Sequence, residues 1–282
     1  SSYAEAPPPV AALFAIMTKV GAYAIIRVYT MIFPVDLEVT SGLHGTWLLP
    51  VAMLSLAVGA VGVLAAKKLD RLVAFAVISS MGMVMVAVGM FTQESIASAL
   101  YYMIHSTLAA GALFLIVDLV RQSRGHLNLV TDAPVTSAAL VSAMFMVAAI
   151  AIAGLPPLSG FVGKLMVLNA AFDDGMAVWV WSFVLVSSLI TIVGFARAGS
   201  VLFWKAQADS APVAEAGRPH PSPLSFIAVG GLLALLVAHT VFAGRIYDYT
   251  TMTAAQLFAP DTYIRTVLDT PGKLQDVKAG DY

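Results

Sequence analysis

Three ionisable side chains lie deep inside long apolar stretches of this sequence: Lys19, His105 and Lys164. In a helix, Lys19 would lie about 16 Å beyond Pro8, near the centre of a bilayer whose hydrocarbon core is about 30 Å thick. Placing a charge there costs at least about 2.5 kcal/mol. Because burial disfavours the charged form of a lysine, such a residue can exchange protons near neutral pH, where histidine already titrates. The three residues therefore predict a pathway for protons or cations.

Each of these residues also has a simpler interpretation. A single intramembrane histidine can be no more than a hydrogen-bonding contact between helices, and a lysine near the end of a span can extend its ammonium to the interface. The depth of Lys19 and Lys164 favours the functional interpretation for both lysines. For His105 taken alone, the two interpretations stay open.

Membrane-spanning helices are the elements that must position these side chains. Sixty per cent of the 282 residues are hydrophobic and 11% are charged, whereas soluble proteins carry roughly 25% charged residues. Backbone groups in hydrocarbon must bond within their own segment, so an apolar stretch of sufficient length crosses the bilayer as a helix. Such stretches lie at 8–33, 45–66, 71–91, 95–120, 135–172, 176–204 and 223–243. The sequence predicts an all-α integral membrane protein with about seven transmembrane helices.

The composition also excludes several classes of function. The formal net charge is -1 and the 15 Lys and Arg residues are scattered, so no nucleic-acid partner is expected. The sequence contains no cysteine, which excludes disulfides and thiolate metal sites. The remaining histidines do not cluster at metal-ligand spacing, and no phosphate-binding glycine motif or nucleophile elbow occurs. We therefore expect no metal and no cofactor.

The fifth apolar segment, 135–172, is too long for one straight span. It is interrupted by Gly154, Pro156, Pro157 and Gly160, so it is one discontinuous helix or two short spans. With a single crossing, the basic connections fall together on the cytoplasmic side and the acidic ones on the other, which favours the discontinuous helix. Transporters use such helices to line ion sites; the alternative is a proline kink that only shapes packing.

The charged residues of these basic and acidic connections lie between the apolar segments. The basic ones are Lys67, Lys68, Arg71, Arg121, Arg124, Lys205 and Arg218. The acidic ones are Asp36, Glu38, Glu94, Asp173 and Asp174.

Weaker candidates for the pathway are hydroxyl groups that can support a chain of water or bond freed backbone groups. They belong to Thr18, Ser79, Ser80, Tyr102 and Ser159. Small residues at a helix contact are the more ordinary interpretation of the two neighbouring serines. Nearer the span ends, Arg27 and Arg197 are candidate interfacial anchors or distant pair partners, and Asp118 is a candidate cytoplasmic gate.

Four motifs, in this order, resemble those of the antiporter-like subunits shared by respiratory complex I and the Mrp-type cation/proton antiporters. They are Thr18-Lys19-Val20-Gly21-Ala22-Tyr23-Ala24-Ile25; Lys68-Leu69-Asp70-Arg71-Leu72-Val73-Ala74-Phe75 with Ser79-Ser80-Met81-Gly82; His105 with Ala112-Leu113-Phe114-Leu115; and Ala153-Gly154-Leu155-Pro156-Pro157-Leu158-Ser159-Gly160-Phe161-Val162-Gly163-Lys164. Within this family, the runs 6–15 and 253–265 are most similar to the D-type subunits of the Mrp (Pha) antiporters.

The resemblance implies that the chain matches helices 8–14 of a fourteen-helix fold built from two inverted five-helix repeats. Residues 1–33 would be a transmembrane helix that closes a missing first repeat, and 34–205 a five-helix repeat with its break at 154–160. A cytoplasmic loop and the last transmembrane helix would occupy 206–243. An extracytoplasmic tail would follow at 244–282, with a short amphipathic helix within 250–268.

The resemblance also assigns roles to single residues. Lys19 matches the lysine of helix 8 that links two half-channels, His105 the histidine of helix 11, and Lys164 the charged residue of helix 12. Many relatives carry a lysine where this sequence has Ala110. That difference shortens the proton relay or leaves the role of that lysine to water. The glutamate–lysine pair of the first repeat is absent and no signal peptide precedes Ser1, so we expect the C-terminal portion of a longer subunit.

The implied function is that of a subunit in a multisubunit monovalent cation (Na⁺ or K⁺)/proton antiporter, a secondary transporter and not an enzyme. The implied location is the bacterial inner (plasma) membrane, which the chain crosses several times. Its partners would be the other subunits of the Mrp complex (A, B, C, E, F and G), protons, Na⁺ or K⁺, and the lipid bilayer. Two alternatives stay open: a proton-pumping subunit of a complex I-type NADH dehydrogenase, and a structural scaffold subunit of a transporter complex.

Overall fold

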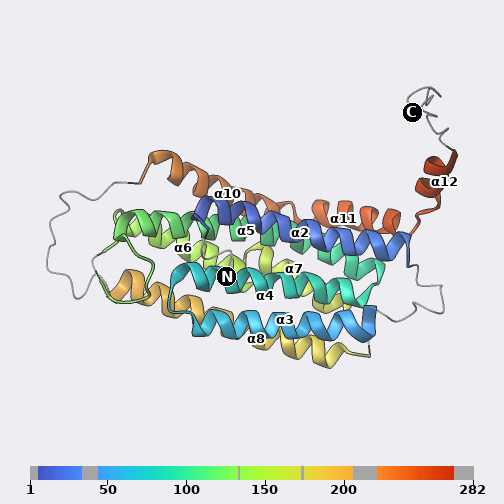
Figure 1. The fold of residues 1–282 in the computed structure, drawn as a ribbon, viewed down its shortest axis with the longest axis horizontal. Helices are drawn as coiled ribbons and strands as arrows, with labels where there is room; N and C mark the ends of the chain where they lie inside the picture. Colours follow the sequence, from blue (N-terminus) through green and yellow to red (C-terminus); the bar gives the residue numbers. More distant parts are fainter. Residues whose placement is uncertain (1–5, 34–43, 133, 173–174, 206–220, 270–282) are drawn as a thin grey trace, which may run out of the picture.

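The computed structural model describes residues 6–33, 44–132, 134–172, 175–205 and 221–269, and in these ranges the chain folds into packed helices (Figure 1). In chain order the elements are α2 (Pro8–Met31), η1 (His44–Leu48), α3 (Leu49–Ala65), α4 (Leu69–Met90), α5 (Gln93–Arg124), α6 (Ala138–Ala153), α7 (Ser159–Ala170), α8 (Ala177–Gly199), η2 (Ser200–Lys205), α10 (Pro223–Val241), α11 (Ala243–Leu257) and α12 (Asp261–Asp269).

The long helices run back and forth along one direction, as expected for a bundle that crosses a membrane (Figure 1). Within the described ranges, six apolar helices are long enough to span a bilayer, and α6 is a shorter apolar helix. In Figure 1, α6 and α7 follow one another along the long axis, so together they make one crossing with a break in the middle. The predicted all-α membrane fold with one discontinuous helix is therefore confirmed.

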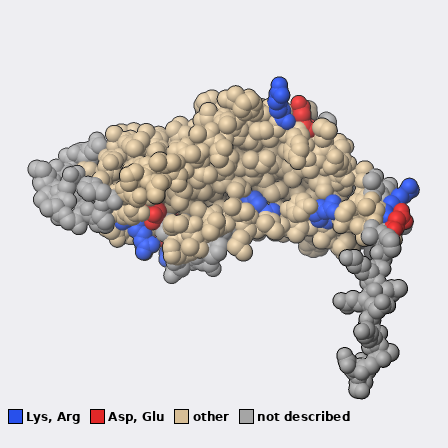
Figure 2. All heavy atoms as spheres, turned by 90° about the horizontal axis from the view of Figure 1, so that it is seen from above, with Lys and Arg blue, Asp and Glu red and all other residues tan. Residues whose placement is uncertain are grey.

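The basic connections lie together at one end of the bundle. The α3–α4 connection, the end of α5 and the end of η2 share the left end in Figure 1, whereas the start of α5, with Glu94, lies at the right end. On the face shown in Figure 2, charged side chains stand in a few small, separate groups, and most of the surface is uncharged. Arg218, Asp36, Glu38, Asp173 and Asp174 lie outside the described residues.

Helix α5 is the centre of the fold. It contacts α2, α4, α6, α7, α10 and α11, and most of its side chains are buried. A capping box at Thr92 and Ser95 begins the helix, and Gly125, with φ of 73°, ends it. The outer helices α2, α3, α8 and α10 instead expose large apolar side chains, which is the surface that lipid or neighbouring subunits would cover.

The C-terminal part of the chain holds two helices. A short amphipathic helix is expected within 250–268; the structure has α11, which begins at Ala243, and α12, which follows from Asp261. Pro260 lies between them and has no backbone N–H to continue the first helix. Helix α11 packs against α5, and Phe258 at its end contacts the ring of Phe91 with centroids 5.3 Å apart.

Helices α3 and α4 approach closely at two glycines. A Cβ atom on Gly82 would overlap the backbone of Leu56, and one on Gly59 would overlap the backbone of Ser79. The Ser79 hydroxyl donates a hydrogen bond to the Leu56 carbonyl over 3.3 Å. Small residues at such crossings let membrane helices pack backbone to backbone.

We predict that Gly82→Val destabilises the fold by about 1–3 kcal/mol, because the added methyl groups must separate α3 from α4. The thermal unfolding midpoint of the detergent-solubilised protein measures this effect. The matched control is Gly231→Val on α10, where nothing lies within 4 Å of the added Cβ. Equal midpoints for the two variants would contradict the proposed close packing.

Candidate functional site

Lys164 binds the open end of the first half of the broken helix. Helix α6 ends at Ala153, and Gly154 follows with φ of 77°, a left-handed conformation that favours glycine. The Lys164 ammonium donates to the Ala153 carbonyl over 2.7 Å and to the Ser188 hydroxyl on α8 over 2.9 Å. The last carbonyls of a helix lack intrahelical partners and carry its negative dipole end, so an ammonium stabilises them.

Gly154 also makes room for that lysine. A Cβ at this position would lie 2.9 Å from the Lys164 Cε and 3.0 Å from its Nζ. Any side chain at position 154 would therefore push the ammonium away from Ala153. The broken helix and the position of the lysine depend on the same glycine.

His105 of α5 meets the other side of the break. Its Nδ1 lies 2.9 Å from the hydroxyl of Ser159, the first residue of α7. The histidine is fully buried, and its Nε2 has no hydrogen-bond partner. Gly160 permits this approach, because a Cβ there would overlap both the His105 ring and the Ala151 carbonyl. Tyr102, one turn earlier on α5, tilts against the His105 ring with centroids 5.4 Å apart.

The remaining predicted lysine lies on α2, which packs against α5. Lys19 is 6% exposed, and its ammonium has no hydrogen-bond partner. Both Lys164 and Lys19 are close enough to His105 to interact with it electrostatically. The structure therefore brings the three residues predicted from sequence to one region, where both lysines lie near His105.

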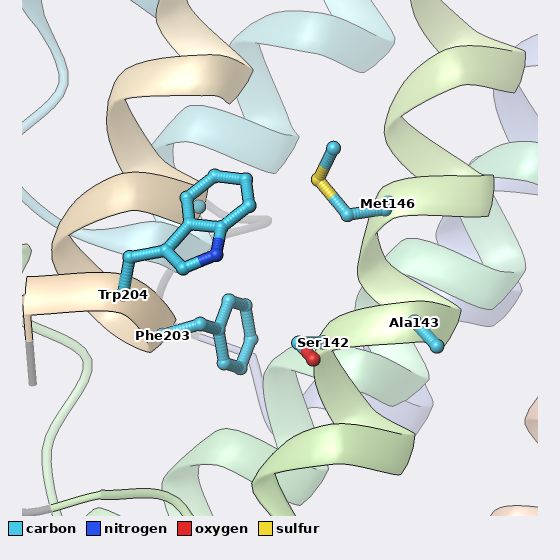
Figure 3. Close-up of a pocket in the computed structure, with 6 residues that line it drawn as sticks. Ser142, Ala143, Met146, Phe203 and Trp204 are labelled. Carbon is cyan, nitrogen blue, oxygen red and sulfur yellow. The ribbon is translucent and has the colours of Figure 1, made fainter. Parts of the chain in front are cut away.

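A cavity of about 250 Å³ reaches Lys164 from between α7 and α8. Apolar side chains such as Phe161, Leu185 and Leu189 form most of its wall, and Lys164 and Ser188 supply the polar side chains. A second cavity, of about 170 Å³, lies between α6 and η2 (Figure 3). Its lining residues, which include Met146 and Trp204, carry no ionisable side chain. Of these two cavities, the first alone touches a residue of the predicted pathway.

The hydroxyl candidates are placed differently from one another. Ser79 bonds Leu56 at the α3–α4 contact, and Thr18 donates to the Ala15 carbonyl of its own helix over 3.1 Å. Ser80 is buried, and its hydroxyl has no hydrogen-bond partner. A water chain through the two serines stays a prediction.

The two arginines and Asp118 each have a polar or aromatic partner. Arg197 of α8 donates to the Ala66 carbonyl at the end of α3 over 2.6 Å. The guanidinium of Arg27 lies 5.1 Å from the centre of the Tyr263 ring. Asp118 accepts a hydrogen bond from Gln122, one turn further along α5, over 2.7 Å.

One residue near His105 was not identified from the sequence. His239 of α10 is 4% exposed and stacks on the ring of Tyr101 with centroids 4.4 Å apart. It interacts electrostatically with His105. Its position inside the last apolar segment could have identified it as an intramembrane ionisable residue. The remaining histidines were instead considered only for metal-ligand spacing. Among the described residues, no three histidine or acidic side chains come together as a metal site.

Comparison with known proteins gives consistent matches. The family model described as "NADH:quinone oxidoreductase/Mrp antiporter, TM" matches residues 1–191. The D-type subunit of the probable K⁺/H⁺ antiporter of Rhizobium meliloti is 32% identical over 96% of this chain and 54% of its own length. The D-type subunit of the Na⁺/H⁺ antiporter of Bacillus subtilis is 32% identical over 95% of this chain and 53% of its own length. The chain thus spans about half the length of these relatives.

Solved structures agree on the fold. A chain of the Mrp complex from Dietzia sp. DQ12-45-1b superposes with a TM-score of 0.79 at 23% identity, over 94% of this chain and 56% of that one. A chain of respiratory complex I from Thermus thermophilus gives a TM-score of 0.73 at 25% identity, over 89% of this chain and 52% of that one. The chain is a multi-pass membrane protein that belongs to the NADH:quinone oxidoreductase/Mrp antiporter transmembrane family, and within it resembles the D-type subunits of the Mrp antiporters.

Proposed function

We propose that this chain is the proton-conducting half of a subunit in a monovalent cation (Na⁺ or K⁺)/proton antiporter of the bacterial plasma membrane. The names of the two D-type relatives support K⁺ or Na⁺, with protons, as the transported ions. The Dietzia complex supports assembly with other Mrp subunits. Those partners would be the remaining Mrp subunits (A, B, C, E, F and G). The chain would act as part of a secondary transporter and not as an enzyme.

One observation carries the proposal: Lys19 and Lys164 form no ion pair with any residue that the structure describes. A lysine held inside a membrane protein for structure alone is expected to have a carboxylate partner, because an unpaired charge in hydrocarbon is costly. An unpaired lysine can instead lose its proton and regain it. The polar contacts of Lys164 are a backbone carbonyl and a hydroxyl, which accept hydrogen bonds without fixing the protonation state.

The proposed path runs along the middle of the bundle from Lys19 past His105 to Lys164. Ser159 holds the His105 ring through Nδ1, which leaves Nε2 free to take up a proton. A proton on one of the three groups raises the free energy of charge on the next by Coulomb repulsion. The proton therefore moves onward, and each group returns to its starting state. Water would bridge the buried polar atoms that lack partners.

Lys164→Arg separates proton exchange from helix capping. Arginine keeps a positive charge at the end of α6 but does not release its proton. We expect a complex that assembles with near wild-type thermal stability, while cation-dependent proton exchange in vesicles falls at least about tenfold. Lys164→Ala should lose both exchange and part of the stability, and Lys205→Ala, on an exposed lysine at the end of η2, is the matched control.

The same variant separates transport from scaffolding. Wild-type exchange by Lys164→Arg and Lys164→Ala would contradict the transport role and favour a structural subunit. In that case changes on the exposed helix faces would impair assembly, and changes at the lysines would not.

His105→Gln is the second test. Glutamine keeps a hydrogen-bonding group near Ser159 but does not titrate. We expect assembly to continue and proton exchange in vesicles to fall at least about tenfold. The control is His126→Gln, because His126 lies in the exposed α5–α6 connection, where it bonds Asp132 over 2.8 Å. Equal loss in both variants would show that the effect is not specific to the buried histidine.

A proton-pumping subunit of a complex I-type enzyme is the second candidate. The description of the family model and the similarity to the Thermus thermophilus complex favour it. The two candidates differ in their partners and share the pathway through the chain. Mass spectrometry of the co-purifying chains distinguishes them, because a redox complex would bring iron–sulfur subunits and an antiporter would not.

A further inference from the structure

One face of α5 carries a polar stripe from the acidic end of the bundle to its middle. Glu94, Ser98, Tyr101 and His105 follow one another at steps of four, three and four residues. At 100° per residue these positions fall within an arc of about 60°, and they extend over about 16 Å of the helix axis. Ser98 and Tyr101 are fully buried, whereas Glu94 is exposed. The stripe therefore leads from the surface to the buried histidine.

Helix α10 covers the inner part of this stripe. The His239 ring stacks on Tyr101 at an interplanar angle of 30°, and the Tyr101 hydroxyl lies 3.5 Å from the His239 carbonyl. The ring Nε2 of His239 is buried and has no hydrogen-bond partner. A buried ring nitrogen without a protein partner is commonly satisfied by a bound water molecule. Packing alone would be served by a phenylalanine.

Helix α11 covers the outer part. Tyr247 lies near the Ser98 side chain and the Glu94 carboxylate. The Ser98 hydroxyl donates to the Glu94 backbone carbonyl over 2.9 Å. Asn169, near the end of α7, donates to the Glu94 carboxylate over 2.7 Å. Three helices thus gather polar groups around the outer end of the stripe, and the carboxylate is held in place at the surface.

We propose that this seam between α5 and the α10–α11 pair is a proton route that connects His105 with the acidic end of the molecule. His239 is its titratable relay, and Glu94 is its mouth. The inference rests on the proposed antiport function and adds a branch outside the path from Lys19 to Lys164. It assigns a transport role to the last two helices that cover α5.

The relay is balanced in protons. His239 accepts a proton through water from the side of His105 and releases one toward Glu94, so its ring returns to the neutral form. Glu94 passes the proton to the aqueous phase and becomes a carboxylate again. Tyr101 is a positioning residue, because its ring and hydroxyl hold the imidazole. At the His105 end of this route, the nearby lysines are Lys164 and Lys19, which interact with His105.

His239→Phe and Glu94→Gln test the route in the full antiporter complex reconstituted in vesicles. Phenylalanine keeps the stack on Tyr101 but carries no proton, and glutamine keeps an acceptor for Asn169 but does not titrate. We expect both variants to assemble with wild-type thermal stability while cation-dependent proton exchange falls about tenfold. Asp248→Asn, on an exposed carboxylate of α11, should exchange at the wild-type rate.

A labelling experiment keeps the test decisive if a variant fails to assemble. The printed sequence has no cysteine, so a single Ser98→Cys can be followed by peptide mass spectrometry at position 98. A small membrane-impermeant thiol reagent added on the side of the acidic end should modify this cysteine, because the seam is hydrated. Ala97→Cys, equally buried but on a different face of α5, should stay unmodified.

The outcomes separate this inference from the function on which it rests. Wild-type exchange by His239→Phe, or no modification of Ser98→Cys, overturns the route, and the antiport proposal stands if Lys164→Arg remains inactive. Wild-type exchange in all three substitutions, at positions 94, 164 and 239, overturns both proposals.

Discussion

The contact between the Lys164 ammonium and the Ala153 carbonyl is the interaction on which the centre of the molecule depends. Hydrocarbon offers no partner to a free carbonyl, so a helix that ends inside the membrane must find one in the protein. Here the partner is the Lys164 ammonium. In the proposed function, the group that stabilises the broken helix is also the group that loses and regains a proton, and the stability of the break would then be coupled to the protonation of Lys164.

The break has a second end, and a titratable group serves it as well. Ser159 begins α7 and meets Nδ1 of His105. The α6 end presents carbonyls, which an ammonium stabilises, and the α7 start presents N–H groups, near which a neutral imidazole is tolerated. Gly154 and Gly160 provide the space on either side. The break and its flanks thus hold two ionisable groups from different helices within one region.

The position of α5 explains why so many polar groups converge. It is the helix that most of the others contact, and its polar residues therefore meet side chains from α2, α7, α10 and α11. In its middle, His105 interacts with Lys19, Lys164 and His239. Toward its start, Glu94 meets Asn169 from α7. The helices of this chain that contact α5 are α2, α4, α6, α7, α10 and α11.

The sequence by itself determined the class of fold, the seven apolar segments and the discontinuous helix, because lipid imposes length and apolarity directly on the residues. It also identified Lys19, His105 and Lys164, since a charge inside an apolar stretch is visible without any neighbour. The start of α11 at Ala243 and the stacking of His239 on Tyr101 depended on the tertiary structure. Tyr101 and His239 lie 138 positions apart in the chain, and no local pattern encodes which face of α10 meets α5. The sequence thus identified Lys19, His105 and Lys164, and only the packing around α5 showed that His239 lies near them.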